Sequence, residues 1–326
     1  MTRERTVPDE DAASVVDAHP DLGGALATPS FALPAGAPDG LPAGLGETRI
    51  GPRTFHWGER TFVMGILNVT PDSFSGDGLL ARSSDDGSGG ASVAAAVAQA
   101  VAMADEGADL LDIGGESTRP GHAAVAAEEE MRRVVPVIRA VRERLPRMPL
   151  TVDTTKPSVA AAALDAGADA INDVWGVAAD DALARLAGER SVPIVLMHNR
   201  AEPRYTNLLP EIVADLQRAI EQVLSAGVAW ANVLVDPGFG FGKTPEQNLA
   251  LLHDLRGLRL LDRPIVLGTS RKSTLGKVLD LPAEERLEAT LATTALGVAA
   301  GVDIVRVHDV RPNVRAARIA DAVVRR

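Results

Sequence analysis

The sequence predicts a (β/α)8 barrel of eight parallel strands alternating with helices, preceded by an N-terminal hairpin and a disordered N-terminal tail. From Phe62 onward, eight short, continuously apolar runs alternate with Ala-rich amphipathic stretches, which is typical of a parallel sheet covered by helices. Three joints repeat one motif, a helix that ends at Gly before a strand: EGADLLDIG, AGADAIND and AGVDIVRVH. Eight such units favour a closed barrel, with a doubly wound open sheet as the alternative.

The chain divides into a tail at residues 1–46 and a barrel domain at residues 47–326. The tail holds six Pro and six Gly among Ala and acidic residues, without sustained helix or strand periodicity. Such a segment cannot bury enough apolar surface to offset the entropy lost on ordering, so we expect it to be disordered. The following residues 47–62 predict a short hairpin, with Gly58 near a turn.

The apolar runs and the stretches between them define the elements of the barrel domain. The predicted strands are FVMGILN (62–68), DLLDIGG (109–115), LTVD (150–153), DAIND (169–173), PIVLMH (193–198), NVLVD (232–236), PIVLGTS (264–270) and DIVRVH (303–308). The predicted helices are 91–106, 128–144, 157–166, 180–189, 210–226, 245–256, 283–300 and 311–325.

Composition excludes several classes of function. The chain has 326 residues and no Cys, which excludes disulfides, thiolate metal sites and a Cys nucleophile. The net charge of the chain is −11, which argues against a nucleic-acid partner. The tail holds seven acidic and two basic residues and so carries −5 of this charge. The longest uncharged run, residues 87–104, is too polar to span a membrane, and the N-terminus lacks the apolar core of a signal peptide. We therefore expect a cytoplasmic protein without a membrane partner.

Polar side chains arrive at the carboxyl end of every predicted strand. In a closed barrel these ends open onto one face, where active sites lie, so residues distant in sequence are expected to converge. A single such residue is more often a strand-end cap, but eight coincident cases favour a site. The residues are Asn68, Glu116 to Arg119, Asp153, Asn172 with Asp173, His198, Asp236, Ser270 to Lys272, and Arg306 with His308.

The charges of this set divide the predicted site into two halves. Asp153, Asn172 and Asp236 offer acceptors and an amide, which suit a flat heterocycle with amidine-like or guanidine-like N–H groups. The cationic half suits a phosphate or pyrophosphate and comprises Arg119, Arg271, Lys272, Arg306 and His308. The segment DPGFGFGK (236–243) is a Gly-rich loop that allows close backbone approach, but its spacing does not match a Walker loop. His198 is interpreted as a hydrogen-bonded core imidazole, with direct catalysis as the alternative, and Asp112 as a residue that orients its neighbours.

Eight sequence blocks that contain these residues resemble those of dihydropteroate synthase, a family of the folate pathway. The resemblance runs from about residue 62 to the C-terminus in the family's order, and the tail lies outside it. The blocks are MGILNVTPDSFS (64–75), GGESTRPG (114–121), VDTTKP (152–157), INDVWG (171–176), LMH (196–198), DPGFGFGKT (236–244), GTSRKS (268–273) and RVHDV (306–310).

The resemblance implies a TIM-type barrel that works as a transferase in folate biosynthesis, with Mg²⁺ as cofactor. It would condense 6-hydroxymethyl-7,8-dihydropterin pyrophosphate with para-aminobenzoate, giving 7,8-dihydropteroate and pyrophosphate. Matched by motif, the pterin site would comprise Asp153, Asn172, Met197, Asp236 and Lys272. The pyrophosphate site would comprise Asn68, Arg306 and His308, with Asn68 also a ligand of Mg²⁺. The para-aminobenzoate site would comprise Thr118, Arg119, Phe241 and Ser273, and the catalytic groups would be Asp153, Asp236, Lys272, Arg306 and His308.

The expected order of events is departure of pyrophosphate followed by attack of the amine, with the loops 69–78 and 117–121 shielding the cation from water. Sulfonamides, as para-aminobenzoate mimics, are expected to compete, and the resemblance implies a homodimer. The first loop departs from the family, because Gly76 precedes Asp77 and Gly78 where many relatives continue Asp-Gly-Gly. Two alternatives are a pterin-binding methyltransferase barrel and a non-catalytic barrel that serves as a binding module.

Overall fold

The barrel is closed by parallel pairing around its whole circumference. The structure is a computed structural model that describes residues 45–69, 89–116, 125–175 and 181–325. Within these residues, eight parallel strands pair in the order β8-β7-β6-β5-β4-β3-β10-β9. The two edge strands are joined by a bridge between Val235 and Ile265, and the Val235 N–H donates to the Pro264 carbonyl at 3.0 Å. The predicted (β/α)8 barrel is therefore confirmed over the open sheet.

The strands follow the predicted apolar runs closely, and only the seventh is much shorter than predicted. The barrel strands are β3 (Phe62–Asn68), β4 (Leu110–Gly114), β5 (Leu150–Asp153), β6 (Ala170–Asp173), β7 (Ile194–Met197), β8 (Val233–Asp236), β9 (Val266–Leu267) and β10 (Ile304–Val307). Nearly every residue in them is buried, as expected for strands that face the barrel interior on one side and helices on the other.

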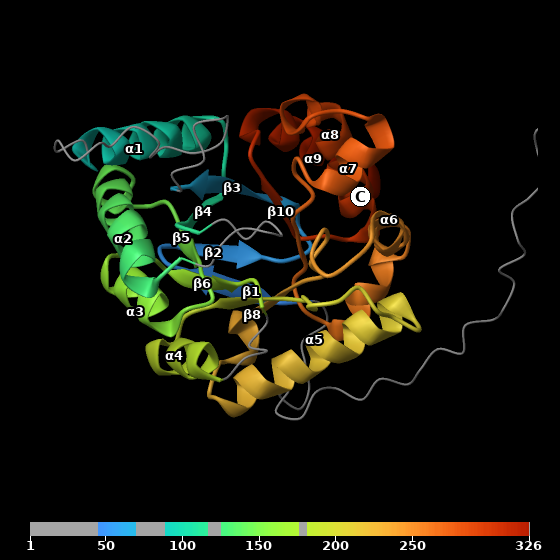
Figure 1. The fold of residues 1–326 in the computed structure, drawn as a ribbon, viewed down its shortest axis with the longest axis horizontal. Helices are drawn as coiled ribbons and strands as arrows, with labels where there is room; N and C mark the ends of the chain where they lie inside the picture. The colour runs from blue at the N-terminus through green and yellow to red at the C-terminus, as the bar shows by residue number, and fades with distance from the viewer. Residues whose placement is uncertain (1–44, 70–88, 117–124, 176–180, 326) are drawn as a thin grey trace, which may run out of the picture. The chain divides into compact units, whose positions relative to one another are not determined.

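Helices surround the strands as a ring (Figure 1). They are α1 (Gly89–Asp105), α2 (Ala127–Arg144), α3 (Pro157–Asp165), α4 (Ala182–Arg190), α5 (Leu208–Ser225), α6 (Pro245–His253), α7 (Ser273–Leu279), α8 (Leu287–Ala300) and α9 (Val310–Val324), with short 3-10 turns at Trp230–Asn232, Leu255–Leu261 and Ala283–Glu285. The amphipathic period explains their docking. Along α5, for example, the buried side chains are Ile212, Val213, Leu216, Ala219, Ile220 and Val223.

The structure contains one helix that was not predicted and corrects two predicted helices. Helix α7 was not predicted, because its seven residues begin at Ser273, the last residue of the polar GTSRKS block, and show no long amphipathic period. The predicted helix 245–256 ends at His253 and continues as a 3-10 turn. The predicted helix 283–300 begins as a separate 3-10 turn at Ala283–Glu285, ahead of α8.

The N-terminal hairpin covers the amino-terminal end of the barrel. Strands β1 (Glu47–Ile50) and β2 (Arg53–His56) pair antiparallel, as predicted. Their turn lies at Gly51, with φ +54°, whereas Gly58, with φ +90°, belongs to the next turn, which leads into β3. One apolar cluster joins the hairpin to the first residues of the barrel strands, and it comprises Leu45, Ile50, Phe55, Trp57, Phe62, Met64, Leu110, Ala170, Val195, Leu234, Val266 and Ile304. The opposite end of the barrel is left for the polar residues.

Two predictions fall on other parts of the chain. The tail that the sequence predicts to be disordered lies outside the described residues, apart from Leu45 and Gly46, as do residues 70–78 and 117–121 of the two predicted loops. No helix in the described ranges is both long and apolar enough to cross a membrane.

Candidate active site

The carboxyl ends of the strands bring the predicted polar residues together. Asn68, Asp153, Met197 and Asp236 are the last residues of β3, β5, β7 and β8, and Asn172 is the last but one of β6. The strand register places Asp153 beside Asn172, and Met197 beside Asp236. The convergence that the sequence predicts is therefore present in the structure, because parallel strands in a closed barrel end on the same face.

A buried ion cluster forms the centre of this face. The Arg306 guanidinium donates from Nε to Oδ2 of Asp112 and from Nη2 to Oδ2 of Asp153, both at 2.6 Å. Asp112 lies fully buried inside β4, where the same oxygen accepts Nδ2 of Asn172 at 2.9 Å and its other oxygen accepts the Thr151 hydroxyl. Asp112 thus orients both Asn172 and Arg306, as its position in the apolar strand suggested.

Asp153 keeps one carboxylate oxygen available inside this cluster. Its Oδ2 binds Arg306, but its buried Oδ1 has no hydrogen-bond partner among the residues that the structure describes. Burial raises the pKa of Asp153 to about 7, against the lowering influence of Arg306 and with a further rise from Asp112. Burial opposes the charge of Arg306, yet Asp112 and Asp153 raise its pKa overall. A buried acceptor without a donor is costly, so this oxygen suits a ligand N–H.

Asp236 connects the site to the Gly-rich loop that follows β8. Its Oδ1 accepts the Gly238 N–H at 2.7 Å, and burial raises its pKa while Gly238, Lys272 and Arg306 lower it. Lys272 places its Nζ 3.8 Å from the centre of the Phe241 ring, a cation–π contact. Asp236, Phe241 and Lys272 are therefore neighbours, although Lys272 comes from a different loop.

The block GTSRKS makes a strained turn before α7. Arg271 has φ +57°, an unusual conformation for a residue with a side chain, and it pairs with Asp309 at 2.9 Å. Its carbonyl accepts Nη1 of Arg286 at 2.9 Å. The turn is thereby fixed at both its backbone and its side chain, and it places Lys272 at the cap of α7 and Ser273, which is exposed, at its first position.

His308 is oriented by a serine of that turn. The Ser270 hydroxyl accepts the His308 backbone N–H at 3.2 Å, and its oxygen lies 2.9 Å from Nδ1 of the ring. When the hydroxyl donates its proton to Nδ1, the ring carries its own proton on Nε2. In that tautomer Nε2 is a donor, whereas a hydroxyl that accepts from Nδ1 leaves Nε2 as an acceptor.

Two of the predicted site residues are not described by the structure, and two polar residues near the site were not predicted. Thr118 and Arg119 lie outside the described residues. Lys243 and Asp215, which lie on either side of the buried His198 and were not singled out, contact His198 at 3.0 Å each. The predicted core role of His198 agrees with these contacts. The Lys that ends a Gly-rich loop was the available signal for Lys243, whereas a helix residue such as Asp215 gave none.

Magnesium requires oxygen ligands, and the described residues offer few. No group of three or more His, Asp or Glu side chains that could hold a metal occurs in these ranges. Asn68, half-buried at the end of β3, carries a hard amide oxygen. Mg²⁺ is commonly held by one or two protein oxygens together with phosphate oxygens and water. Asn68 therefore fits an ion that is bound mainly through a pyrophosphate.

The chain matches a family model described as "Pterin binding enzyme" over residues 64–308. It is 48% identical over 279 residues to the dihydropteroate synthase of Clostridium beijerinckii, which covers 85% of this chain and 100% of that protein.

Solved structures show the same relationship. A dihydropteroate synthase from Clostridium difficile, with pteroic acid, is 46% identical with a TM-score of 0.78, and covers 83% of this chain and 100% of that chain. One from Xanthomonas albilineans with 4-aminobenzoic acid is 41% identical with a TM-score of 0.77, and the match covers 85% of this chain and 97% of that chain. One from Yersinia pestis with a sulfonamide drug is 38% identical with a TM-score of 0.78, and the match covers 85% of this chain and 98% of that chain.

Proposed function

The chain belongs to the dihydropteroate synthase family of pterin-binding enzymes, and from this premise we propose how its residues divide the family's reaction. The protein is a transferase that condenses 6-hydroxymethyl-7,8-dihydropterin pyrophosphate with para-aminobenzoate to give 7,8-dihydropteroate and pyrophosphate. The observation that supports the division best is the buried cluster of Asp112, Asp153, Asn172 and Arg306, with its unpartnered carboxylate oxygen.

The pterin ring occupies the acidic half of the site. Asp153 Oδ1 accepts a ring N–H, and the amide of Asn172 and the carboxylate of Asp236 satisfy further donors and acceptors of the ring edge. Met197, 4% exposed, supplies an apolar wall, and Lys272 donates to a ring acceptor. Several charge-assisted hydrogen bonds to a flat heterocycle give both affinity and orientation.

The pyrophosphate lies beside Asn68, Arg306 and His308. Arg306 is already held by two carboxylates, so it acts as a fixed positive group that does not need to reorganise when negative charge develops. His308 donates from Nε2 when the Ser270 hydroxyl donates to Nδ1. The Asn68 amide oxygen would hold a Mg²⁺ ion, which would supply positive charge to offset the negative charge that develops on the leaving group.

The para-aminobenzoate site lies next to the pterin site. Phe241 and Ser273 contribute from the described residues, and Thr118 and Arg119 complete it. The contact between Phe241 and Lys272 supports this placement, because it joins a residue of the second site to one of the first. The aniline nitrogen can then reach the methylene carbon of the bound pterin.

Pyrophosphate leaves before the amine attacks. The C–O bond breaks with its electron pair on the pyrophosphate, and the electron-rich dihydropterin stabilises the resulting exocyclic cation, which Asp153 and Asp236 favour electrostatically. The amine nitrogen then forms the C–N bond and loses a proton. No protein nucleophile takes part. Release of pyrophosphate from dihydropterin pyrophosphate in the absence of para-aminobenzoate is the expected result, and an absolute requirement for the second substrate would contradict this order.

The decisive assay mixes purified protein, Mg²⁺, dihydropterin pyrophosphate and para-aminobenzoate, and measures dihydropteroate and pyrophosphate. We expect both products in equal amounts and competition by sulfonamides. Asp153→Ala should remove activity, whereas Asp165→Ala, on an exposed helix position, should leave it unchanged. A folded wild-type protein that forms no product would contradict the function.

The protein forms a homodimer through α8 and α9. These helices pack together and carry exposed apolar side chains at Leu296, Ile319 and Val323, which are 59%, 71% and 62% exposed. Apolar side chains gathered on an outer face favour burial against a partner. Sedimentation should give twice the 34.0 kDa chain mass, and Ile319→Glu should give the monomer. Leu260→Glu, at a similarly exposed leucine elsewhere, is the control, and a wild-type monomer would refute the dimer.

A further inference from the structure

The segment 237–243, here called the glycine loop, lies directly on the backbone that follows β7. Gly238, Gly240 and Gly242 have φ values of +68°, +83° and +54°. A Cβ at Gly238 would lie 1.8 Å from the His198 carbonyl oxygen, and one at Gly242 would lie 2.3 Å from that of Arg200. Only glycine permits this approach, so the loop's position depends on the residues beneath it.

Lys243 turns back under the glycine loop and ties it from inside. Its Nζ lies 3.0 Å from each of three groups: the carbonyl oxygens of Gly238 and Phe241, and Nδ1 of His198. An ammonium group has three N–H donors, so these three acceptors match its full capacity. Lys243 thereby connects two points of the loop to His198, the residue after β7. Its three N–H groups all donate to protein atoms.

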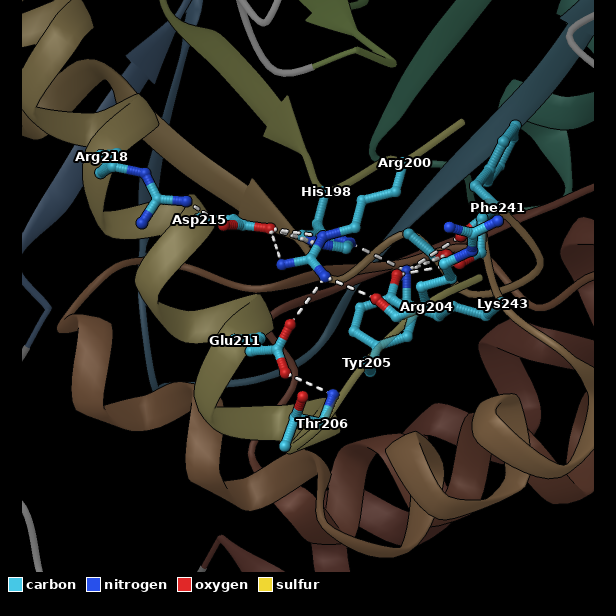
Figure 2. A network of polar contacts seen from close by, with 12 residues as sticks. His198, Arg200, Arg204, Tyr205, Thr206, Glu211, Asp215, Arg218, Phe241 and Lys243 are labelled. Atoms are coloured by element: carbon cyan, nitrogen blue, oxygen red, sulfur yellow. Dashed lines mark hydrogen bonds and ion pairs between the residues drawn. The ribbon is translucent and has the colours of Figure 1, made fainter. Parts of the chain in front are cut away.

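His198 links Lys243 to helix α5 through a second hydrogen bond. Because Nδ1 accepts from Lys243, the ring proton lies on Nε2, which donates to Oδ2 of Asp215 at 3.0 Å. The side chain of His198 is 1% exposed. Asp215 is held in turn by Arg200, whose Nε and Nη2 lie 2.9 and 2.7 Å from the same oxygen (Figure 2).

Tyr205, which contacts Arg200, forms a further hydrogen bond to the glycine loop. The Tyr205 hydroxyl donates to the Gly242 carbonyl at 2.9 Å, and the Arg200 guanidinium lies 4.5 Å from the centre of the Tyr205 ring. Arg200 also donates to Glu211 at 2.7 Å (Figure 2). The glycine loop is therefore fixed at Gly238, Phe241 and Gly242 by groups that come from the β7–α5 region and from its own Lys.

We propose that Lys243 and His198 are positioning residues that hold the glycine loop so that Phe241 lies against Lys272, and thereby set the affinity for the arylamine substrate. The inference rests on the proposed function, because it takes Phe241 as a wall of the para-aminobenzoate site. It assigns the arylamine before the pterin, because Phe241 is the side chain that the loop contributes to the para-aminobenzoate site, whereas the loop reaches Asp236 through the Gly238 backbone N–H and the backbone of Asp236 belongs to β8.

The protonation states give this tie a pH dependence. Burial lowers the pKa of Lys243 to about 7, with Arg200 and Lys272 lowering it further and Asp236 and Asp215 raising it. Burial also lowers the pKa of His198 to about 4, with Lys243 and Arg200 acting in the same direction and Asp215 opposing. His198 is thus neutral near pH 7, where Lys243 titrates. After losing its proton, Lys243 has two N–H groups for three acceptors, and one tie is lost.

The test compares Michaelis constants for the two substrates. Lys243→Met should raise the KM for para-aminobenzoate by about tenfold, the effect expected for losing a charge-assisted hydrogen bond, and leave that for dihydropterin pyrophosphate within about threefold. His198→Leu should behave like Lys243→Met. His198→Asn, whose Oδ1 can replace Nδ1 as acceptor for Lys243, should restore most of the affinity. Lys277→Met, at an exposed position on α7, is the matched control.

A pH series provides a readout that a purely structural role would not change. The ratio of the para-aminobenzoate KM of Lys243→Met to that of the wild type cancels the titration of the substrates. We expect this ratio to fall as the pH rises through about 7, because the wild type then loses the same proton. A ratio that stays constant from about pH 6 to 9 would overturn the proposal.

The outcomes separate this inference from the proposed function. A wild-type protein without synthase activity refutes the function, whereas an active wild type with equal KM changes for both substrates, or none, refutes the positioning role alone. Should Lys243→Met not fold, the pair His198→Leu and His198→Asn decides, because both variants keep the lysine and differ in whether it finds an acceptor at position 198. A higher para-aminobenzoate KM in His198→Leu than in His198→Asn supports the proposal, and equal values refute it.

Discussion

At the scale of single residues, the hydrogen-bond partners of Asp153 and Arg306 determine what a ligand can bind at the carboxyl end of the barrel. Asp153 is hydrogen-bonded through one oxygen, and its other oxygen is buried without a partner in the described part of the chain, while Arg306 is shared between two carboxylates. Asp153 and Arg306, which the sequence analysis assigned to the acidic and the cationic half of the site, therefore contact one another in the structure. A ligand that donates to Asp153 completes this cluster instead of competing with it.

The raised pKa of Asp153 predicts a pH dependence of pterin binding. A folded pKa of about 7 lies above the ordinary value, so the folded state holds the proton more tightly, and the stability this contributes at low pH is lost as pH rises through 7. Binding behaves oppositely, because ring N–H donors need the ionised carboxylate. Pterin affinity measured by calorimetry should rise between about pH 5.5 and 7.5.

Asp153→Asn is the control for that prediction. The amide cannot ionise, so its pterin affinity should be weaker and independent of pH over the same range, and Asp165→Asn should follow the wild type. A wild-type affinity that does not change with pH would contradict the role of Asp153.

Among the elements, α7 shows how a close approach supports the site. A Cβ at Gly276 would lie 2.2 Å from Nη2 of Arg286, the side chain that binds the Arg271 and Leu281 carbonyls. Gly276→Ala should therefore displace Arg286 and lower the free energy of unfolding by about 1–3 kcal/mol, measured by urea denaturation. Val278→Ala, exposed on the same helix, should change it by less than about 0.5 kcal/mol, and equal effects would contradict the explanation.

The start of α6 carries a second element-scale prediction. Thr244 accepts the Gln247 N–H at 3.2 Å, and the Gln247 side chain accepts the Thr244 N–H at 2.8 Å, which is a capping box. Thr244→Ala should cost about 1 kcal/mol of unfolding free energy, and Thr244→Ser should retain most of it. If thermal unfolding finds the two variants equally destabilised, the hydroxyl is not the stabilising group.

At the scale of the whole molecule, the hairpin and the site occupy opposite ends of one barrel. Phe55 is 1% exposed, stacks on Trp57 and contacts the edge of Phe62. Phe55→Ala should lower the free energy of unfolding by about 3–5 kcal/mol while leaving the KM values of the folded enzyme unchanged. His56→Ala, its exposed neighbour on β2, is the control. A changed KM in Phe55→Ala would show that the two ends are coupled.

The sequence predicted the barrel because its strands are short apolar runs whose period and boundaries are local properties. It also predicted that Asp153, Asn172 and Asp236 would meet, because strand ends converge in any closed barrel. It did not predict that Arg306 would pair with Asp112 and Asp153, since choosing among partners from distant strands requires three-dimensional coordinates. Helix α7 was missed for a different reason: seven residues are too few to show a helical period.

The covered end of the barrel also makes the protein convenient to attach to a surface. The chain contains no Cys, so a single thiol introduced at Arg49, an exposed position of β1, would be its only reactive sulfur. A molecule anchored through that thiol would present the strand ends carrying Asp153 and Asp236 to the solution. Ligand binding could then be followed by surface methods without the anchor obstructing the entrance.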